Sequence, residues 1–135
     1  MTRLARAMEG DFEHRLKVHG VSRAACAVLS AIRNDGKNTP ASLASFIGID
    51  RAAITRHLDR LEKQGLLVRE TSTTDRRFVN LKLTRKGSRL VPKLVADSKA
   101  TNAKFLAGLT ATEKRGLHEL IQKMLTNSDL VPGDI

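Results

Sequence analysis

The chain has 135 residues, about the length of one domain, and 41% of them are hydrophobic and 28% charged. It has no apolar run of membrane-spanning length and no continuous apolar stretch near its start, so we expect a cytoplasmic protein without membrane contact. A single cysteine, Cys26, excludes an intrachain disulfide. The net charge of +10 indicates a polyanionic partner, although a merely solubilising surface would give the same composition.

The kind of polyanion is narrowed by the aromatic content, which is four Phe with neither Trp nor Tyr. Modules that bind single-stranded nucleic acids stack bases on aromatic rings, so this composition favours double-stranded DNA, whose phosphates supply the affinity. The charge is also uneven, because residues 39–87 carry +5, residues 1–38 carry +3 and residues 88–135 carry +2. The middle of the chain is therefore the expected contact region.

The first two predicted elements are helices. One runs to about Val18, ends at Gly20, and carries an apolar stripe with a spacing of four residues: Leu4, Met8, Phe12 and Leu16. Ser22 can cap the second helix with its hydroxyl, and the residues 34–36 (Asn-Asp-Gly) end it. The apolar positions of this second helix are Cys26, Val28, Leu29 and Ile32.

Two short helices follow, over residues 40–47 after the cap Thr39 and over residues 51–64 after the cap Asp50. Ala44, Gly48 and Ile54 have the spacing of a helix-turn-helix: a small residue where the helices touch, a glycine at the bend and an apolar residue that locks the second helix. Many helical hairpins would show the same pattern, so the spacing is a modest signal by itself.

The second of these helices has a cationic face. If Ile54, Leu58 and Leu61 are buried, the opposite face presents Lys63 and the residues that we expect to contact DNA in the major groove: Arg51, Ala52, Thr55, Arg56 and Arg60. Thr39 and Ser42, at the start of the preceding helix, are candidates for contacts with the DNA backbone. An ordinary solvated helix face is the alternative interpretation.

A β-hairpin is predicted next. A strand begins at residues 66–68, and Val79, Leu81 and Leu83 alternate with polar residues in a second strand. The polar tip between the strands contains five candidate DNA contacts: Thr73, Thr74, Asp75, Arg76 and Arg77. Arg77 could enter a minor groove, held by a bidentate ion pair with Asp75. The alternative is a surface turn with a weak ion pair.

The remaining sequence is predicted to be helical. A long segment runs from about Arg85 to Leu109, and Pro92 inside it should kink it or shift its start. Thr110 and Glu113 form a capping box that opens the last helix, and residues 128–135 are expected to be a loose tail.

No catalytic, cofactor or metal signature is present. The chain lacks a phosphate-binding glycine loop and a nucleophile elbow, and its string His118-Glu119 has Gln122 where a zincin has its second histidine. The four histidines are scattered along the sequence. We therefore expect neither an enzyme nor a metal site, and no cofactor.

Three segments together resemble one family. Residues 61–69 (LEKQGLLVR), 75–77 (DRR) and 81–87 (LKLTRKG) are similar to the MarR family of bacterial winged helix-turn-helix regulators. The Asp-x-Arg wing followed by Leu-Thr-x-x-Gly is the most specific stretch. The resemblance implies a mainly α fold with a small β-hairpin wing (α+β), formed as one domain over residues 1–135. Residues 22–84 would form the DNA-binding region, and residues 1–20 and 85–127 would form dimerisation helices.

The resemblance further implies a homodimer on a pseudo-palindromic operator, with repression relieved by a small ligand or by oxidation. The apolar stripes of the terminal helices independently favour a second copy, although packing within one chain is the alternative. Arg15 and Cys26 are candidates for an effector pocket, which would take a small aromatic or anionic ligand. Cys26 lies among alanines, a setting typical of an inert thiol. A thiol switch at Cys26 and a protein-interaction module remain alternative functions.

Overall fold

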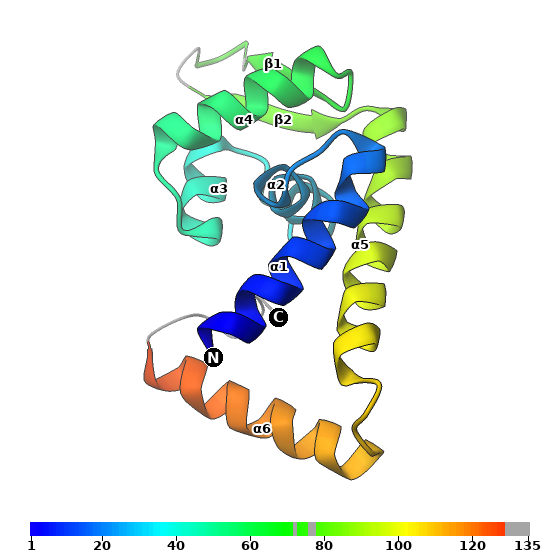
Figure 1. The fold of residues 1–135 in the computed structure, drawn as a ribbon. Coiled ribbons are helices and arrows are strands. Elements are labelled where there is room, and N and C mark those ends of the chain that lie inside the picture. The colour runs from blue at the N-terminus through cyan, green and yellow to red at the C-terminus, as the bar shows by residue number, and fades with distance from the viewer. Residues whose placement is uncertain (72, 76–77, 129–135) are drawn as a thin grey trace. The chain divides into compact units, whose positions relative to one another are not determined.

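The computed structural model describes residues 1–71, 73–75 and 78–128, and the chain divides into two compact units, Met1–Thr101 and Asn102–Ile135 (Figure 1). The first unit contains α1 (Thr2–Leu16), a 3-10 turn (Lys17–His19), α2 (Arg23–Asn34), α3 (Pro40–Ile47), α4 (Arg51–Lys63), β1 (Leu67–Thr71) and β2 (Val79–Leu83). α5 (Arg85–Leu106) begins in this unit and ends in the next, and α6 (Ala111–Asn127) lies in the second unit. The predicted fold class, mainly α with a β-hairpin, is confirmed.

Short-range capping sets most helix starts. The hydroxyl of Ser22 accepts a hydrogen bond from the N–H of Ala25 at 3.1 Å. Asp50 accepts from the N–H of Ala53 at 2.8 Å, and this bond lowers the pKa of the Asp50 carboxyl. These contacts satisfy N–H groups that the first turn of a helix leaves without a partner. The predicted starts of α2 and α4 are thereby confirmed.

The turn between α3 and α4 also follows the prediction. Gly48 ends α3 in the left-handed conformation (φ 77°), which a residue with a side chain adopts at a cost. Thr39 and Ser42 form a capping box, because each hydroxyl accepts from the backbone N–H of the other residue, at 3.1 and 3.2 Å. Both side chains therefore have a structural role at the start of α3.

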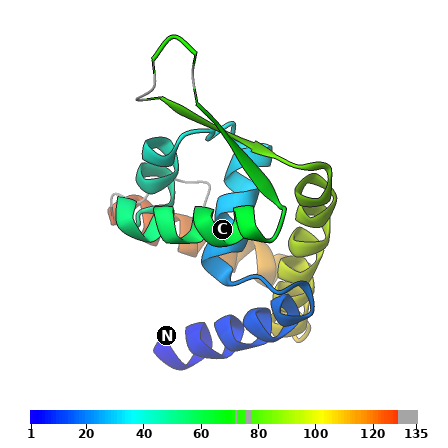
Figure 2. The same cartoon turned by 90° about the horizontal axis from the view of Figure 1, so that it is seen from above.

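The hairpin is antiparallel, with Leu67 opposite Leu83 and Thr71 opposite Val79. Leu67 and Leu81 are buried in the core, whereas the outer ends of β1 and β2 extend beyond the helices of the first unit (Figure 2). One face of the hairpin thus joins the core, and Thr73 and Thr74 beyond the strands are exposed.

One hydrophobic core holds the first unit together, and α2 lies at its centre with contacts to α1, α3, α4 and β2 (Figure 1). Burying one large aliphatic side chain contributes roughly 1.5–3 kcal/mol to the stability of the fold. The largest side chains with less than 2% exposure come from both strands and every α-helix of the unit: Leu16, Val28, Leu29, Leu43, Ile54, Leu58, Leu61, Leu67, Leu81, Val91 and Leu94.

α5 runs through Pro92 and starts at Arg85, so the proline has not shifted its start. Pro92 lacks the N–H that would donate to the carbonyl of Ser88 one turn earlier. Nη1 of Arg33, on α2, donates to that carbonyl instead. A long-range bond thus satisfies the acceptor that the proline leaves free, which sequence periodicity could not show.

Two further polar contacts join α5 to the N-terminal segment. Nε2 of His19 lies 2.9 Å from Oδ2 of Asp97. The hydroxyl of Thr101, which is 3% exposed, donates to Oδ2 of Asp11 at 2.8 Å, and Nε of Arg15 donates to the same oxygen at 2.9 Å. Buried hydroxyls are costly without a partner, so this contact fixes the distance between α1 and α5.

The second unit contains α6, which the capping box of Thr110 and Glu113 opens as predicted. Three apolar side chains on one side of α6 are exposed, with values of 38%, 60% and 54%: Leu117, Leu120 and Met124. No described helix is both long and apolar enough to cross a membrane.

Candidate nucleic-acid interface

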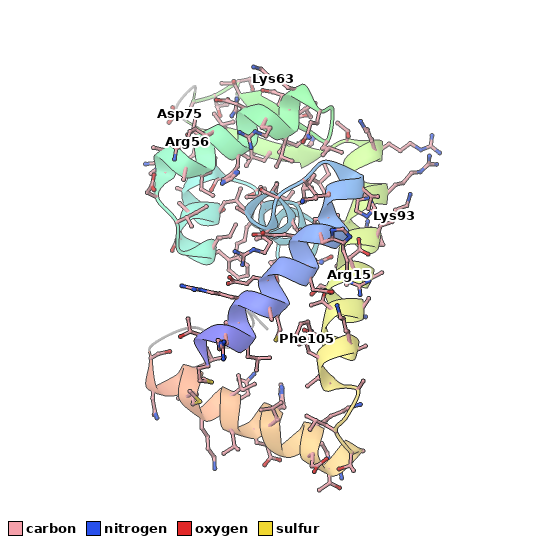
Figure 3. The ribbon with its side chains drawn as sticks, viewed as in Figure 1. Arg15, Arg56, Lys63, Asp75, Lys93 and Phe105 are labelled. Carbon is pink, nitrogen blue, oxygen red and sulfur yellow. The ribbon has the colours of Figure 1, made fainter. Side chains whose placement is uncertain are left out.

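α4 has one buried and one exposed face. Ile54, Leu58 and Leu61 are at most 1% exposed, as expected from their spacing. All the residues proposed for the opposite face are exposed: Arg51, Ala52, Thr55, Arg56, Arg60 and Lys63. Figure 3 labels Arg56 and Lys63 along this helix. The structure therefore presents a cationic helix face that has a small residue, Ala52, one turn before Arg56.

Thr55 has a more specific arrangement. Its hydroxyl donates to the carbonyl of Arg51 at 2.9 Å, which is a common use of a helical threonine. The hydroxyl proton is therefore occupied, while the methyl group and an oxygen lone pair stay accessible. The methyl group of Thr55 can contact a thymine methyl, and the oxygen lone pair can accept a hydrogen bond from a base amino group.

Arg69, on β1, is not among the predicted site residues. Its guanidinium contacts two carboxylates of α4: Nη2 lies 2.7 Å from Oδ1 of Asp59, and Nη1 lies 3.2 Å from Oε2 of Glu62. These are the two acidic residues inside α4. Asp59 and Glu62 are three residues apart and therefore lie on neighbouring turns of the helix. This spacing is the sequence feature that could have predicted a shared cationic partner. Arg69 thus compensates the negative charge beside the cationic face.

Replacing Arg69 with alanine should expose both carboxylates to an approaching phosphate backbone. We expect DNA affinity to fall roughly tenfold by like-charge repulsion, with little change in base preference. Fluorescence anisotropy with labelled duplexes measures the loss. In an Asp59→Asn, Glu62→Gln background the same substitution should cost little. Lys82→Ala is the matched control, because its ion pair with Glu70 lies on the same hairpin and is exposed at both ends. An equal loss in both backgrounds would contradict the charge argument.

The hairpin tip is described in part. Thr73 and Thr74 are exposed and Asp75 is partly buried, and the carbonyl of Asp75 accepts from the N–H of Phe78 at 3.1 Å. Arg76 and Arg77, the two proposed wing arginines, lie outside the described residues. The wing contacts therefore stay a prediction.

The two candidate effector residues differ in their surroundings. Arg15 pairs with Asp11 on the preceding turn of α1, whereas Cys26 is 8% exposed on α2. A cavity of about 370 Å³ between α2 and α5 is lined by other residues: Arg33, Asn34, Val91, Pro92, Val95, Ala96 and Lys99. The two cationic side chains, Arg33 and Lys99, together with the apolar residues of the lining, suit a small anion with a hydrophobic body.

Burial raises the pKa of the Cys26 thiol, and a hydrogen bond with Ser30 opposes this rise in part. A raised pKa leaves less thiolate, the reactive form, at neutral pH. We expect iodoacetamide to alkylate the native protein at least about tenfold more slowly than the urea-unfolded protein. The alkylation rate of the native protein should rise only at a pH above the usual range of thiol pKa values. Equal rates in both states would show an accessible, reactive thiol.

The arrangement defines a class of protein: a winged helix-turn-helix, in which a cationic helix and a β-hairpin lie on one compact unit. Residues 21–79 match the MarR family model. The chain is 27% identical to a mutant MarR from E. coli complexed with operator DNA, with a TM-score of 0.80 and coverage of 92% of this chain and 89% of that chain. It is 25% identical to a putative MarR family transcriptional regulator from Listeria monocytogenes complexed with 26mer DNA, with a TM-score of 0.79 and coverage of 93% and 84%.

A third solved structure, the YusO protein from Bacillus subtilis, is 26% identical with a TM-score of 0.75, and the alignment covers 93% of this chain and 89% of that chain. The MarR family model thus matches the chain from α2 through β1, and the resemblance to this family of winged helix-turn-helix transcription regulators, read from the sequence, is confirmed.

Proposed function

We propose that this regulator binds a specific, pseudo-palindromic duplex operator as a homodimer and represses transcription until a small ligand releases it. The observation that carries the proposal is the exposed cationic face of α4, whose two acidic residues are paired with Arg69. An α-helix fits the major groove, where arginine distinguishes guanine. Two of the similar solved structures are complexes with DNA, which supports the same partner here.

Exposed apolar side chains support the dimer. The exposed apolar residues of α6, together with Met1 just before α1 and Leu4 within it (88% and 53% exposed), leave apolar surface in water. Covering such surface contributes about 25 cal/mol per Å². A second copy would cover it and would present two recognition helices about 34 Å apart, which is one turn of DNA.

The cavity between α2 and α5 supports a ligand response. Arg33 lies at the end of α2, and the loop after it leads into α3 and carries Asn38, whose carbonyl accepts from Leu81 of the wing strand at 2.7 Å. An anion that draws Arg33 away from Ser88 would therefore act on the connection between α5 and the helix-turn-helix. Benzoate is titrated into the Arg33→Ala and Arg15→Ala variants, and its effect on thermal stability is measured. Loss of the thermal shift in Arg33→Ala indicates this cavity, whereas loss in Arg15→Ala indicates a pocket at Arg15 and Cys26.

Selection of bound genomic fragments followed by sequencing tests the function. We expect a small set of fragments with a shared inverted repeat, and light scattering should show a dimer. Enrichment of no fragment would contradict the operator proposal and would favour a protein-interaction module. A thiol switch predicts that peroxide releases the wild type but not Cys26→Ser, whereas we expect the two proteins to respond alike because the thiol is buried.

A further inference from the structure

We propose that a basic ridge on the first half of α5 binds the sugar-phosphate backbone of the duplex held by α4, as a second contact outside the helix-turn-helix. The ridge consists of Arg85, Arg89 and Lys93. This inference rests on the proposed binding of DNA and adds a surface to it.

The ridge follows from the spacing of its residues. Arg85, Arg89 and Lys93 are four residues apart, so they project from one side of α5 at intervals of about 6 Å. All three are exposed, and no acidic residue occurs between Arg76 and Ala96. Lys93 is labelled on α5 in Figure 3. The result is a row of positive charge about 12 Å long.

The ridge cations have no carboxylate partner in the part of the chain that the structure describes. Other basic residues of the same unit do, as Arg15, Arg23, Arg69 and Lys82 show. Like charges four residues apart repel each other, and cations are also unfavourable near the start of a helix. The free protein therefore carries a repulsion that a polyanion would relieve.

The ridge adjoins the end of the recognition helix. Nζ of Lys86, beside the ridge, donates to the carbonyl of Gln64 at 2.9 Å, directly after α4. The hydroxyl of Thr84 donates to the carbonyl of Gly65 at 2.6 Å. These bonds fix the first turn of α5 against the end of α4, where Lys63 is exposed. The positive charge of the α4 face thus continues onto α5 within one compact unit.

The side chains around the ridge favour a nucleic-acid backbone over an acidic protein. The arginines that stabilise protein interfaces usually act beside a buried aromatic or other large apolar anchor. Among the described residues, the large apolar side chains with high exposure lie on other elements, and none belongs to α5. A surface with regular cations and no apolar anchor suits phosphates, which need charge alone.

A charge-matched comparison tests the ridge. The variant Arg85→Gln, Arg89→Gln, Lys93→Gln is compared with Lys114→Gln, Arg115→Gln, Lys123→Gln, which removes the same charge from exposed positions on α6. Affinity for random and operator duplexes is measured over a series of salt concentrations. We expect the salt slope to fall by about two to three per protomer in the ridge variant and to stay unchanged in the control. The ratio of operator to random affinity should not change.

A second variant shows whether the change in salt slope comes from the lost charge or from misfolding. Arg85→Lys, Arg89→Lys keeps the charge and should restore the wild-type slope, since phosphate contact does not need a guanidinium. A ridge variant whose slope equals that of the α6 control would overturn the proposal, and would instead direct a search toward an acidic protein partner. Failure of the operator proposal is distinguishable, because it would show as the absence of a preferred sequence while the slope on random duplex still reports the ridge.

Discussion

Replacing Gly87 with alanine is expected to destabilise the protein by more than about 3 kcal/mol, or to prevent folding, because the new methyl group has no space. Its carbon would overlap the carbonyl oxygen of Leu66 and lie 3.0 Å from the carbonyl carbon. The Leu66 backbone cannot move away easily, since its carbonyl accepts from Thr84 at 3.1 Å and its N–H donates to Leu61 at 3.0 Å. Urea unfolding followed by circular dichroism measures the loss.

Gly116→Ala is the matched control. Gly116 lies inside α6, and nothing is within 4 Å of the position that its methyl group would occupy. Alanine is a better helix former, so this variant should gain about 0.5–1 kcal/mol of helix stability. If Gly87→Ala is as stable as the wild type, α5 must pack against the turn after α4 less closely than the structure indicates.

The predictable features of this fold are those that depend on neighbours in sequence. Ser22, Thr39, Asp50 and Thr110 were expected as caps, and each accepts the N–H three residues later. Such contacts need only a side-chain acceptor and the start of an apolar periodicity. The alternation in the second strand worked for the same reason, because Leu81 is buried where the period of two requires it.

Contacts between distant segments were not predictable. The guanidinium of Arg69 meets Asp59 and Glu62 only after the turn that follows α4 reverses the chain. The bond from Arg33 to the carbonyl left free by Pro92 joins residues 55 apart in sequence. Gly87 belongs to a motif recognisable by resemblance, but the reason for the glycine, the close approach of Leu66, is visible only in the packed structure.

Arg56→Ala is expected to weaken operator binding by about 1–3 kcal/mol, or roughly 5- to 150-fold. Arg56 follows Ala52 by one turn on the face opposite Ile54 and Leu58, so the small Ala52 side chain allows this part of α4 to approach the base edges closely. A bidentate contact with guanine is lost when the guanidinium is removed. The loss should therefore be concentrated on the operator and should relax the preference at one base pair of each half-site.

Lys63→Ala is the matched control for Arg56→Ala. Lys63 is exposed at the end of α4, where a recognition helix meets the backbone, so its removal should weaken operator and random duplexes alike. Both variants should lower the salt slope by about one, because each loses one cation. What separates them is the ratio of operator to random affinity, which should fall for Arg56→Ala and stay constant for Lys63→Ala. If Arg56→Ala also leaves the ratio constant, Arg56 contacts phosphate, and the base readout must come from Thr55, Ala52 or Arg51 instead.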